Sequence, residues 1–136
     1  MEVENGIRVL LVHPGKYAEE GRLGSDLKSM QDFVGGSIEG FYPFEEAVCI
    51  VCNDEGKVNG MSPNRAVYDD QGDIADIVCG SFFVADCSDS NFGSLSDDQM
   101  EKYKKLFLKP ERFYRIGTQI VARKYDPALS HKDVSR

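Results

Sequence analysis

The fold class of this chain follows from residues 25–60, which read SDLKSMQDFVGGSIEGFYPFEEAVCIVCNDEGKVNG. The first part of the stretch predicts a short amphipathic helix, because its apolar residues recur at helical spacing. The residues of this apolar stripe are Leu27, Met30, Phe33 and Val34. A helix of about three turns is marginal alone, so we expect the stripe to pack on a sheet.

Both ends of the predicted helix carry clear signals. Ser25 or Asp26 can cap its first turn by accepting a backbone N–H. Gly35 and Gly36 end it, because glycine readily adopts the left-handed conformation that helix C-termini commonly need. The sequence therefore places this helix between the cap and the glycine pair.

Two strands are predicted directly after this helix. Residues 37–44 form the first, which ends near Pro43 or lies at an edge, because proline has no N–H to donate. Residues 47–52, AVCIVC, form the second, since an unbroken apolar run is typical of a strand covered on both faces. Residues 54–57 then form a glycine-containing turn.

Further elements are predicted on either side of this stretch. Residues 7–12 and 74–86 are apolar enough to be strands, and Gly80 marks a bulge or a close backbone contact in the second. A capping box formed by Ser96 and Gln99 opens a second helix. Its apolar stripe consists of Met100, Tyr103 and Phe107, with Leu106 beside it.

The last predicted element is a hairpin, in which residues 112–116 and 119–125 flank a Gly-Thr turn. Residues 13–24 and 58–72 are predicted to be connections over the surface, because turn-forming and polar residues dominate them. Within the second connection, Pro63–Ala66 is expected to begin a single helical turn.

These elements predict an α+β fold with one domain over residues 1–136 and a core over residues 7–125. We expect a mainly antiparallel sheet of about six strands packed by two helices, in the order β-α-β-β-β-α-β-β. Residues 1–5 and 126–136 are expected to be loose termini.

Length and composition favour an ordinary globular protein. The chain has 136 residues, of which 41% are hydrophobic and 29% charged, so it can bury a core without disulfides. It has no apolar run of the ~20 residues that a membrane helix requires. The first residues, MEVENGIRVLLV, lack the basic start and long apolar core of a secretory signal. We therefore expect a cytoplasmic protein that does not contact a membrane.

The four cysteines are interpreted as small buried apolar residues rather than as metal ligands. Cys49 and Cys52 form a CxxC, but on a strand their side chains point to opposite faces. Cys79 and Cys87 do not have the spacing of a second pair of zinc ligands. The acidic run at residues 69–73 lacks the alternating ligands of a calcium loop. We expect no metal and no cofactor.

The net charge of −7 is unevenly divided along the chain. Residues 1–53 carry −5, residues 54–98 carry −8 and residues 99–136 carry +6. This excess of acid argues against a general nucleic-acid-binding protein. The basic C-terminal part leaves two interpretations open, a surface for phosphate or an acidic partner, or simply a solvated helix face and tail.

The polar residues around the central hairpin are the candidate ligand-binding residues: Asn53, Asn59, Asn64, Arg65 and Tyr42. Arg65 is the only basic residue between Lys57 and Lys102, so it could bind a small anionic ligand. The alternative is that the asparagines hold turn backbones and Arg65 pairs with Asp69 or Asp70.

Six segments, in this order, resemble the domain of unknown function 3846 family: LLVHPGK, LKSMQDFVGGSIEGFYPF, VCNDEGKVNGMSPNRA, DIVCGSFFVAD, LSDDQMEKY and FYRIGTQIV. The most specific parts are VGGSIE, the NDEGK turn and the Asn64-Arg65 pair. The resemblance covers roughly residues 7–125. It implies a small, compact α+β protein of bacteria, their phages and mobile elements, and it implies no particular catalytic residue.

Two functions remain open at this point. The first is a non-catalytic binding or interaction module, with a link to phages or mobile elements, because no catalytic motif occurs in the sequence. The second is a small-molecule or nucleotide-binding protein, with or without enzymatic activity, that has an anion site near Asn64 and Arg65. His13 could act as an acid or base, but no nucleophile stands near it in the sequence.

Overall fold

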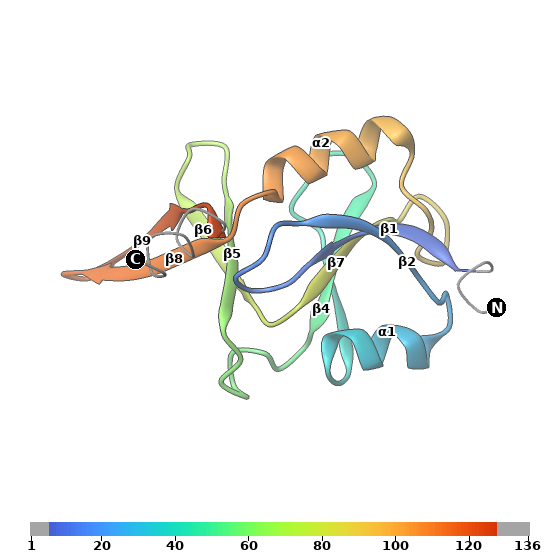
Figure 1. The fold of residues 1–136 in the computed structure, drawn as a ribbon, viewed down its shortest axis with the longest axis horizontal. Coiled ribbons are helices and arrows are strands. Elements are labelled where there is room, and N and C mark those ends of the chain that lie inside the picture. Colours follow the sequence, from blue (N-terminus) through green and yellow to red (C-terminus); the bar gives the residue numbers. More distant parts are fainter. Residues whose placement is uncertain (1–5, 128–136) are drawn as a thin grey trace.

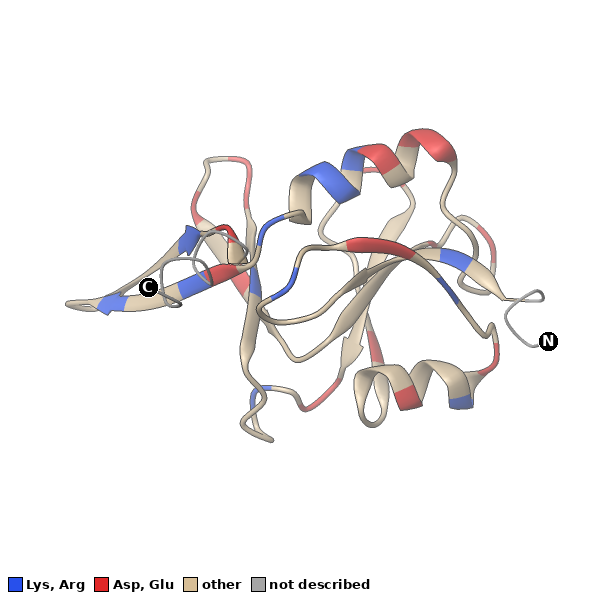
Figure 2. Cartoon of the chain, viewed as in Figure 1, with Lys and Arg blue, Asp and Glu red and all other residues tan. Residues whose placement is uncertain are grey.

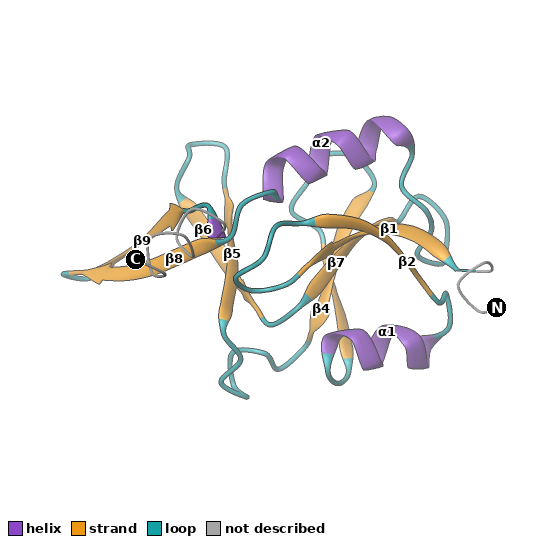
Figure 3. Cartoon of the chain, viewed as in Figure 1, coloured by secondary structure: helices purple, strands orange, loops and turns teal. Residues whose placement is uncertain are grey.

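The fold is built on a five-stranded, fully antiparallel sheet. The computed structural model describes residues 6–127, and Figures 1 and 3 show the sheet at the centre of the molecule. Its strands, in spatial order, are β2 (Glu19–Leu23), β1 (Ile7–Val12), β7 (Phe82–Asp86), β4 (Val48–Asn53) and β3 (Ile38–Phe41). The three central strands are the most apolar, since both of their faces are covered.

The two helices cover opposite faces of this sheet (Figure 1). Helix α1 (Leu27–Val34) buries Met30 and Val34 on the side of Phe83. Helix α2 (Asp97–Phe107) buries its apolar stripe on the side of Phe82. Because successive strand residues point to opposite faces, the neighbours Phe82 and Phe83 enter two different cores.

Two smaller two-stranded ribbons complete the fold. In the first, β5 (Pro63–Tyr68) pairs with β6 (Ile74–Cys79), and Val67 and Val78 extend the α2-side core. In the second, β8 (Glu111–Ile116) pairs with β9 (Gln119–Lys124). This second ribbon projects from the body at the left of Figure 1, and we call it the arm.

The predicted α+β class is confirmed, although the main sheet has five strands rather than six. The Asp26 side chain caps α1 by accepting from the Ser29 N–H at 3.0 Å, and Gly35 ends the helix with a φ of 83°. The predicted capping box of α2 is also present. One residue of the α1 stripe was wrongly placed: the Leu27 side chain is 57% exposed at the first turn.

Two predicted connections contain strands. Residues 13–24 include β2, an edge strand whose sequence EEGRL has almost no apolar signal. Residues 58–72 include β5, so the helical turn expected at Pro63–Ala66 is wrong. The polar residues of β5 obscured it, because buried strands are normally recognised by apolar side chains.

The long strand predicted over residues 74–86 is two strands belonging to different sheets. Gly80 separates them with a φ of 84°, and its N–H donates to the Ser62 carbonyl at 2.8 Å. A Cβ at this position would lie 2.7 Å from the Met61 Sδ, so the close neighbour is a side chain rather than the backbone that the sequence suggested. Gly80 therefore redirects the chain from the β5–β6 ribbon into the centre of the main sheet.

Several other predictions can be compared with the structure. Cys49 and Cys52 lie on opposite faces of β4, as expected, and all four cysteines are free. Within residues 6–127, no helix is long and apolar enough to cross a bilayer. The predicted loose termini fall almost entirely outside the described residues.

Candidate functional site

Asn64, one of the predicted ligand-binding residues, is buried at the junction of three segments. Its side chain is 1% exposed and its Nδ2 donates to the carbonyls of Val12 at 3.0 Å and Gly80 at 2.8 Å. The first carbonyl ends β1 and the second lies in the turn between β6 and β7. Asn64 therefore ties the β5–β6 ribbon to the main sheet.

Arg65 is fully buried beside it and forms no ion pair with any carboxylate of residues 6–127. Its Nε donates to the Phe107 carbonyl at 3.0 Å, and its Nη2 to the Lys16 carbonyl at 2.8 Å. Its Nη1 donates to the Asn64 Oδ1 at 2.8 Å. The ion pair with Asp69 or Asp70 that the sequence left open does not form. Burial lowers the pKa of Arg65 to about 10, so the guanidinium stays charged at neutral pH.

The other three predicted residues lie elsewhere. Asn53 is buried; its Nδ2 donates to the Val34 carbonyl at 3.2 Å and its Oδ1 accepts from the Glu55 N–H at 2.8 Å. Asn59 is exposed in the following turn, and Tyr42 is 60% exposed after β3. The structure thus brings Asn64 and Arg65 together in one buried polar knot, which Asn53, Asn59 and Tyr42 do not join.

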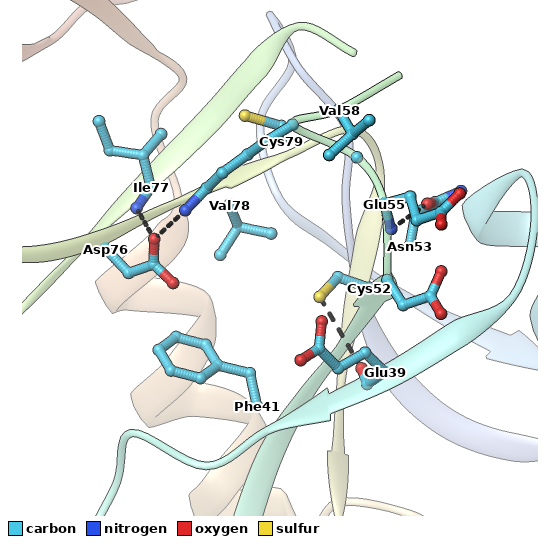
Figure 4. A pocket seen from close by; sticks show the side chains of 13 residues that line it. Glu39, Phe41, Cys52, Asn53, Glu55, Val58, Asp76, Ile77, Val78 and Cys79 are labelled. Carbon is cyan, nitrogen blue, oxygen red and sulfur yellow. Dashed lines mark hydrogen bonds and ion pairs between the residues drawn. The ribbon is translucent and has the colours of Figure 1, made fainter. Parts of the chain in front are cut away.

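Asn53 lines a cavity with a volume of about 320 Å³ between β3, β4 and β6 (Figure 4). Lys57 and Asp76 form an ion pair beside it, and the Cys52 and Cys79 side chains lie on its walls. Burial raises the pKa of the Cys52 thiol to about 11, so this sulfur stays protonated at neutral pH. Lys57 pairs with Asp76, whereas the other acids of the lining, Glu39, Asp54 and Glu55, form no ion pair within residues 6–127. Phe41 is the one aromatic residue among those that line this cavity, so a ligand would meet few ring faces here.

A larger cavity of about 530 Å³ lies between α2, β5 and the loop that follows β3, and we call it the aromatic pocket. Phe44 packs against Tyr103 with ring centroids 4.7 Å apart and meets Phe107 edge-on at 6.3 Å. Tyr68 on β5 and Leu106 on α2 are each nearly half exposed beside it. The pocket lining therefore includes four aromatic residues, of which Tyr103 and Phe107 are buried and Tyr68 is exposed to solvent.

Carboxylates dominate the polar rim of the aromatic pocket. Glu46 accepts from the Lys102 Nζ at 2.6 Å and from the Tyr103 hydroxyl at 2.7 Å, and these contacts lower its pKa. Glu111 accepts a hydrogen bond from the Ala66 N–H at 3.0 Å. The carboxylate thus takes the position that a carbonyl of a neighbouring strand would have beside β5. The charged lining residues are four acids, Glu45, Glu46, Asp70 and Glu111, and two lysines, Lys102 and Lys124.

Glu111 gives the site a pH-dependent contribution to stability. Burial raises its pKa, because a charged carboxylate is poorly solvated there. Between the ordinary glutamate pKa and the raised pKa of Glu111, the carboxyl is protonated in the folded state and ionised in the unfolded state. The free energy of unfolding should therefore fall as pH rises between these two values. We expect Glu111→Gln, which keeps an acceptor for Ala66, to remove this slope, which is at most about 1.4 kcal/mol per pH unit.

Urea denaturation of wild type and Glu111→Gln at several pH values measures how the free energy of unfolding of each protein depends on pH. The pH should run from roughly 4, near the ordinary glutamate pKa, to about 8. A wild-type stability that rises more steeply with pH than that of the variant would contradict the assignment.

His13 and Ser81 form a contact that sequence reasoning missed. The His13 Nδ1 lies 2.7 Å from the Ser81 Oγ, and the imidazole packs on Phe33 at 5.1 Å between centroids. Burial lowers the pKa of His13. Neither residue lines the two cavities, so we interpret the pair as a tie between the end of β1 and the turn before β7. Their separation of 68 residues gives no local signal in the sequence.

Comparison with known protein families places these features in context. A family model described as a domain of unknown function, DUF3846, matches residues 7–108. The chain belongs to the DUF3846 family. The DUF3846 match includes the main sheet, both helices and the polar knot, and it ends before β8. A search of curated proteins found no match, and neither did a search of solved structures.

Proposed function

We propose that this protein is a non-catalytic binding module of the cytoplasm that uses the aromatic pocket to hold an apolar or aromatic group carrying a positive charge. The pocket volume of about 530 Å³ is in the range of small-ligand sites. The observation that carries the proposal is the combination of aromatic rings in tilted and edge-on contact with four acids and two lysines around the pocket.

The lining chemistry supports binding rather than catalysis. Nucleophilic catalysis needs a reactive side chain next to a base, and general acid catalysis needs a carboxyl aimed at the substrate. In the pocket, Glu46 is committed to Lys102 and Tyr103, and Glu111 is committed to Ala66. The Tyr103 hydroxyl donates to Glu46, and burial raises its pKa further. These groups hold the walls in place.

The expected preference for a cation has two physical causes. Aromatic faces attract cations through their quadrupole, by roughly 0.5–2 kcal/mol depending on exposure. The excess of carboxylates on the rim and the net charge of −7 also favour positive ligands over negative ones. A basic side chain of a partner protein and a small organic cation share this chemistry.

The anion site predicted around Asn64 and Arg65 has less support, because all three guanidinium nitrogens of Arg65 donate to groups of the protein. The connection with a phage or mobile element stays a prediction.

Three probes of similar shape and different charge test the proposal: 2-phenylethylammonium, 2-phenylethanol and 3-phenylpropionate. We expect the ammonium probe to bind roughly 3–30-fold tighter than the alcohol, from the cation–aromatic energy, and the carboxylate to bind weakest. Dissociation constants from isothermal titration calorimetry with the full chain give the ranking.

A matched pair of variants separates the pocket from the general charge of the protein. Asp70→Asn removes one exposed carboxylate at the rim, whereas Asp89→Asn removes an exposed carboxylate in the loop after β7. We expect only the first to weaken the ammonium probe, by about 3-fold, in keeping with an exposed ion contact. Equal affinities for the three probes, or tightest binding of the carboxylate, would refute the proposed function.

A further inference from the structure

The arm presents two arginines directly opposite each other on one face. Arg112 on β8 pairs in register with Arg123 on β9, and directly opposed residues of an antiparallel pair point to the same side. Like charges in this position destabilise a ribbon. None of the ion pairs within residues 6–127 involves either arginine. Among the residues that the structure describes, the two guanidinium groups therefore lie side by side without a carboxylate in ion-pair contact.

The side chain of Arg112 is held in place by an aromatic ring. Its guanidinium carbon lies 4.1 Å from the centroid of the Tyr125 ring, so stacking restrains the side chain. The Tyr125 N–H in turn donates to the Pro110 carbonyl at 3.0 Å, which closes the base of the arm. A guanidinium held in this way loses less freedom when it binds a planar carboxylate.

Exposed apolar side chains continue the same face toward the tip of the arm. The pair after the arginines is Tyr114 with Val121, and the next is Ile116 with Gln119. Tyr114 is 47% exposed and Ile116 is 64% exposed. We call this surface, made of Arg112, Arg123, Tyr114, Val121 and Ile116, the arginine face. Large apolar groups exposed beside unpaired charges are typical of an interaction surface.

We propose that the arginine face binds an acidic segment of a partner protein, whose carboxylates contact Arg112 and Arg123 and whose apolar side chains pack on Tyr114 and Ile116. Arginine suits this role because its fork can bind a carboxylate through two parallel hydrogen bonds. The arm is a different site from the aromatic pocket, and its ligand has the opposite charge. The inference therefore goes beyond the proposed function.

The charge distribution favours a protein segment over nucleic acid. Residues 1–98 carry −13 and residues 99–136 carry +6, which together make −7, and Figure 2 shows basic residues on the projecting arm and acidic residues over much of the body. A long polyanion would be repelled by that body. A short acidic segment can contact the arm alone. Its apolar side chains can also bury the exposed Ile116, whereas the phosphates of a nucleic acid make no apolar contact.

Fluorescence anisotropy tests the inference with a labelled synthetic peptide in which pairs of glutamates alternate with pairs of leucines. This pattern places an acidic and an apolar residue on the same side of an extended chain. We expect the full-length protein to bind it at low salt and to lose affinity at high salt. Any binding of the same peptide with lysine in place of glutamate should use the aromatic pocket and should not be weakened by Arg123→Gln.

Two variants locate the binding. Arg123→Gln should weaken the peptide about 10-fold, the range of one charge-assisted contact, while Lys105→Gln on the exposed side of α2 should change it less than about 2-fold. Arg123→Gln should leave the melting temperature unchanged or slightly higher, because it removes a like-charge pair.

Three results would overturn the inference. They are the absence of peptide binding at low salt, tighter binding of a duplex or single-stranded DNA than of the acidic peptide, and a clear drop in melting temperature for Arg123→Gln. The last result would show that the opposed arginines serve the fold instead of a partner.

Discussion

Replacing Arg65 with methionine is expected to lower the free energy of unfolding by about 3–5 kcal/mol. The variant leaves the carbonyls of Phe107 and Lys16 and the Oδ1 of Asn64 without their donor. The contacts with Phe107 and Asn64 are buried, so water cannot readily replace the guanidinium there, whereas the contact with Lys16 is partly buried. Urea denaturation followed by circular dichroism gives the difference.

A matched control is Arg115→Met on the exposed part of β8, where the same change should stay within about 0.5 kcal/mol. Arg65→Lys keeps the positive charge, but a lysine cannot reach three separated acceptors. The free energy of unfolding of Arg65→Lys should therefore lie between that of wild type and that of Arg65→Met. A loss below about 1 kcal/mol for Arg65→Met, below even the cost of one unsatisfied buried group, would show that Arg65 is not a structural tie.

Truncation of Phe82 to alanine is the second change with a large expected effect, about 3–5 kcal/mol. The ring is fully buried and meets Phe107 of α2 edge-on, with centroids 5.6 Å apart. Phe83→Ala should cost a similar amount through the other core, because that ring packs on Phe33 of α1. Thermal or urea denaturation measures both losses.

Milder substitutions can show that the two rings belong to separate cores. In double-mutant cycles, Phe82→Leu and Phe107→Leu should couple by about 0.5–1.5 kcal/mol, since the rings touch. Phe83→Leu and Phe107→Leu lie on opposite faces of the sheet and should add within about 0.5 kcal/mol. Coupling of the second pair as strong as that of the first would contradict the two-core arrangement.

Elements with strong local patterns could be predicted from the sequence. Both helices followed from apolar residues at helical spacing and from side-chain caps, and β4 followed from its unbroken apolar run. The arm followed from alternation around Gly117, which has a φ of 64°. In each case the deciding residues lie within a few positions of one another, so the pattern is visible without tertiary contacts.

Elements whose cause is tertiary could not be predicted in this way. β5 was missed because two of its buried residues are Asn64 and Arg65, whose partners are backbone groups 16 to 52 residues away. The sequence pointed to the same two residues as ligand-binding residues, because polar side chains are usually exposed and available to a ligand. The aromatic pocket was missed because the loop at Phe44, helix α2 and strand β5 meet only in the folded chain.

Mapping the chemical-shift changes that 2-phenylethylammonium causes in the full-length protein tests the central claim most directly. The claim is that a ligand binds in the aromatic pocket, whereas Asn64 and Arg65 stabilise the fold. In ¹H–¹⁵N spectra, the account predicts saturable shifts concentrated on Ala66 to Tyr68, Lys102 to Phe107 and the loop at Phe44 to Glu46. Shifts concentrated around the cavity of Asn53, Lys57 and Asp76, or the absence of any saturable shift, would contradict it.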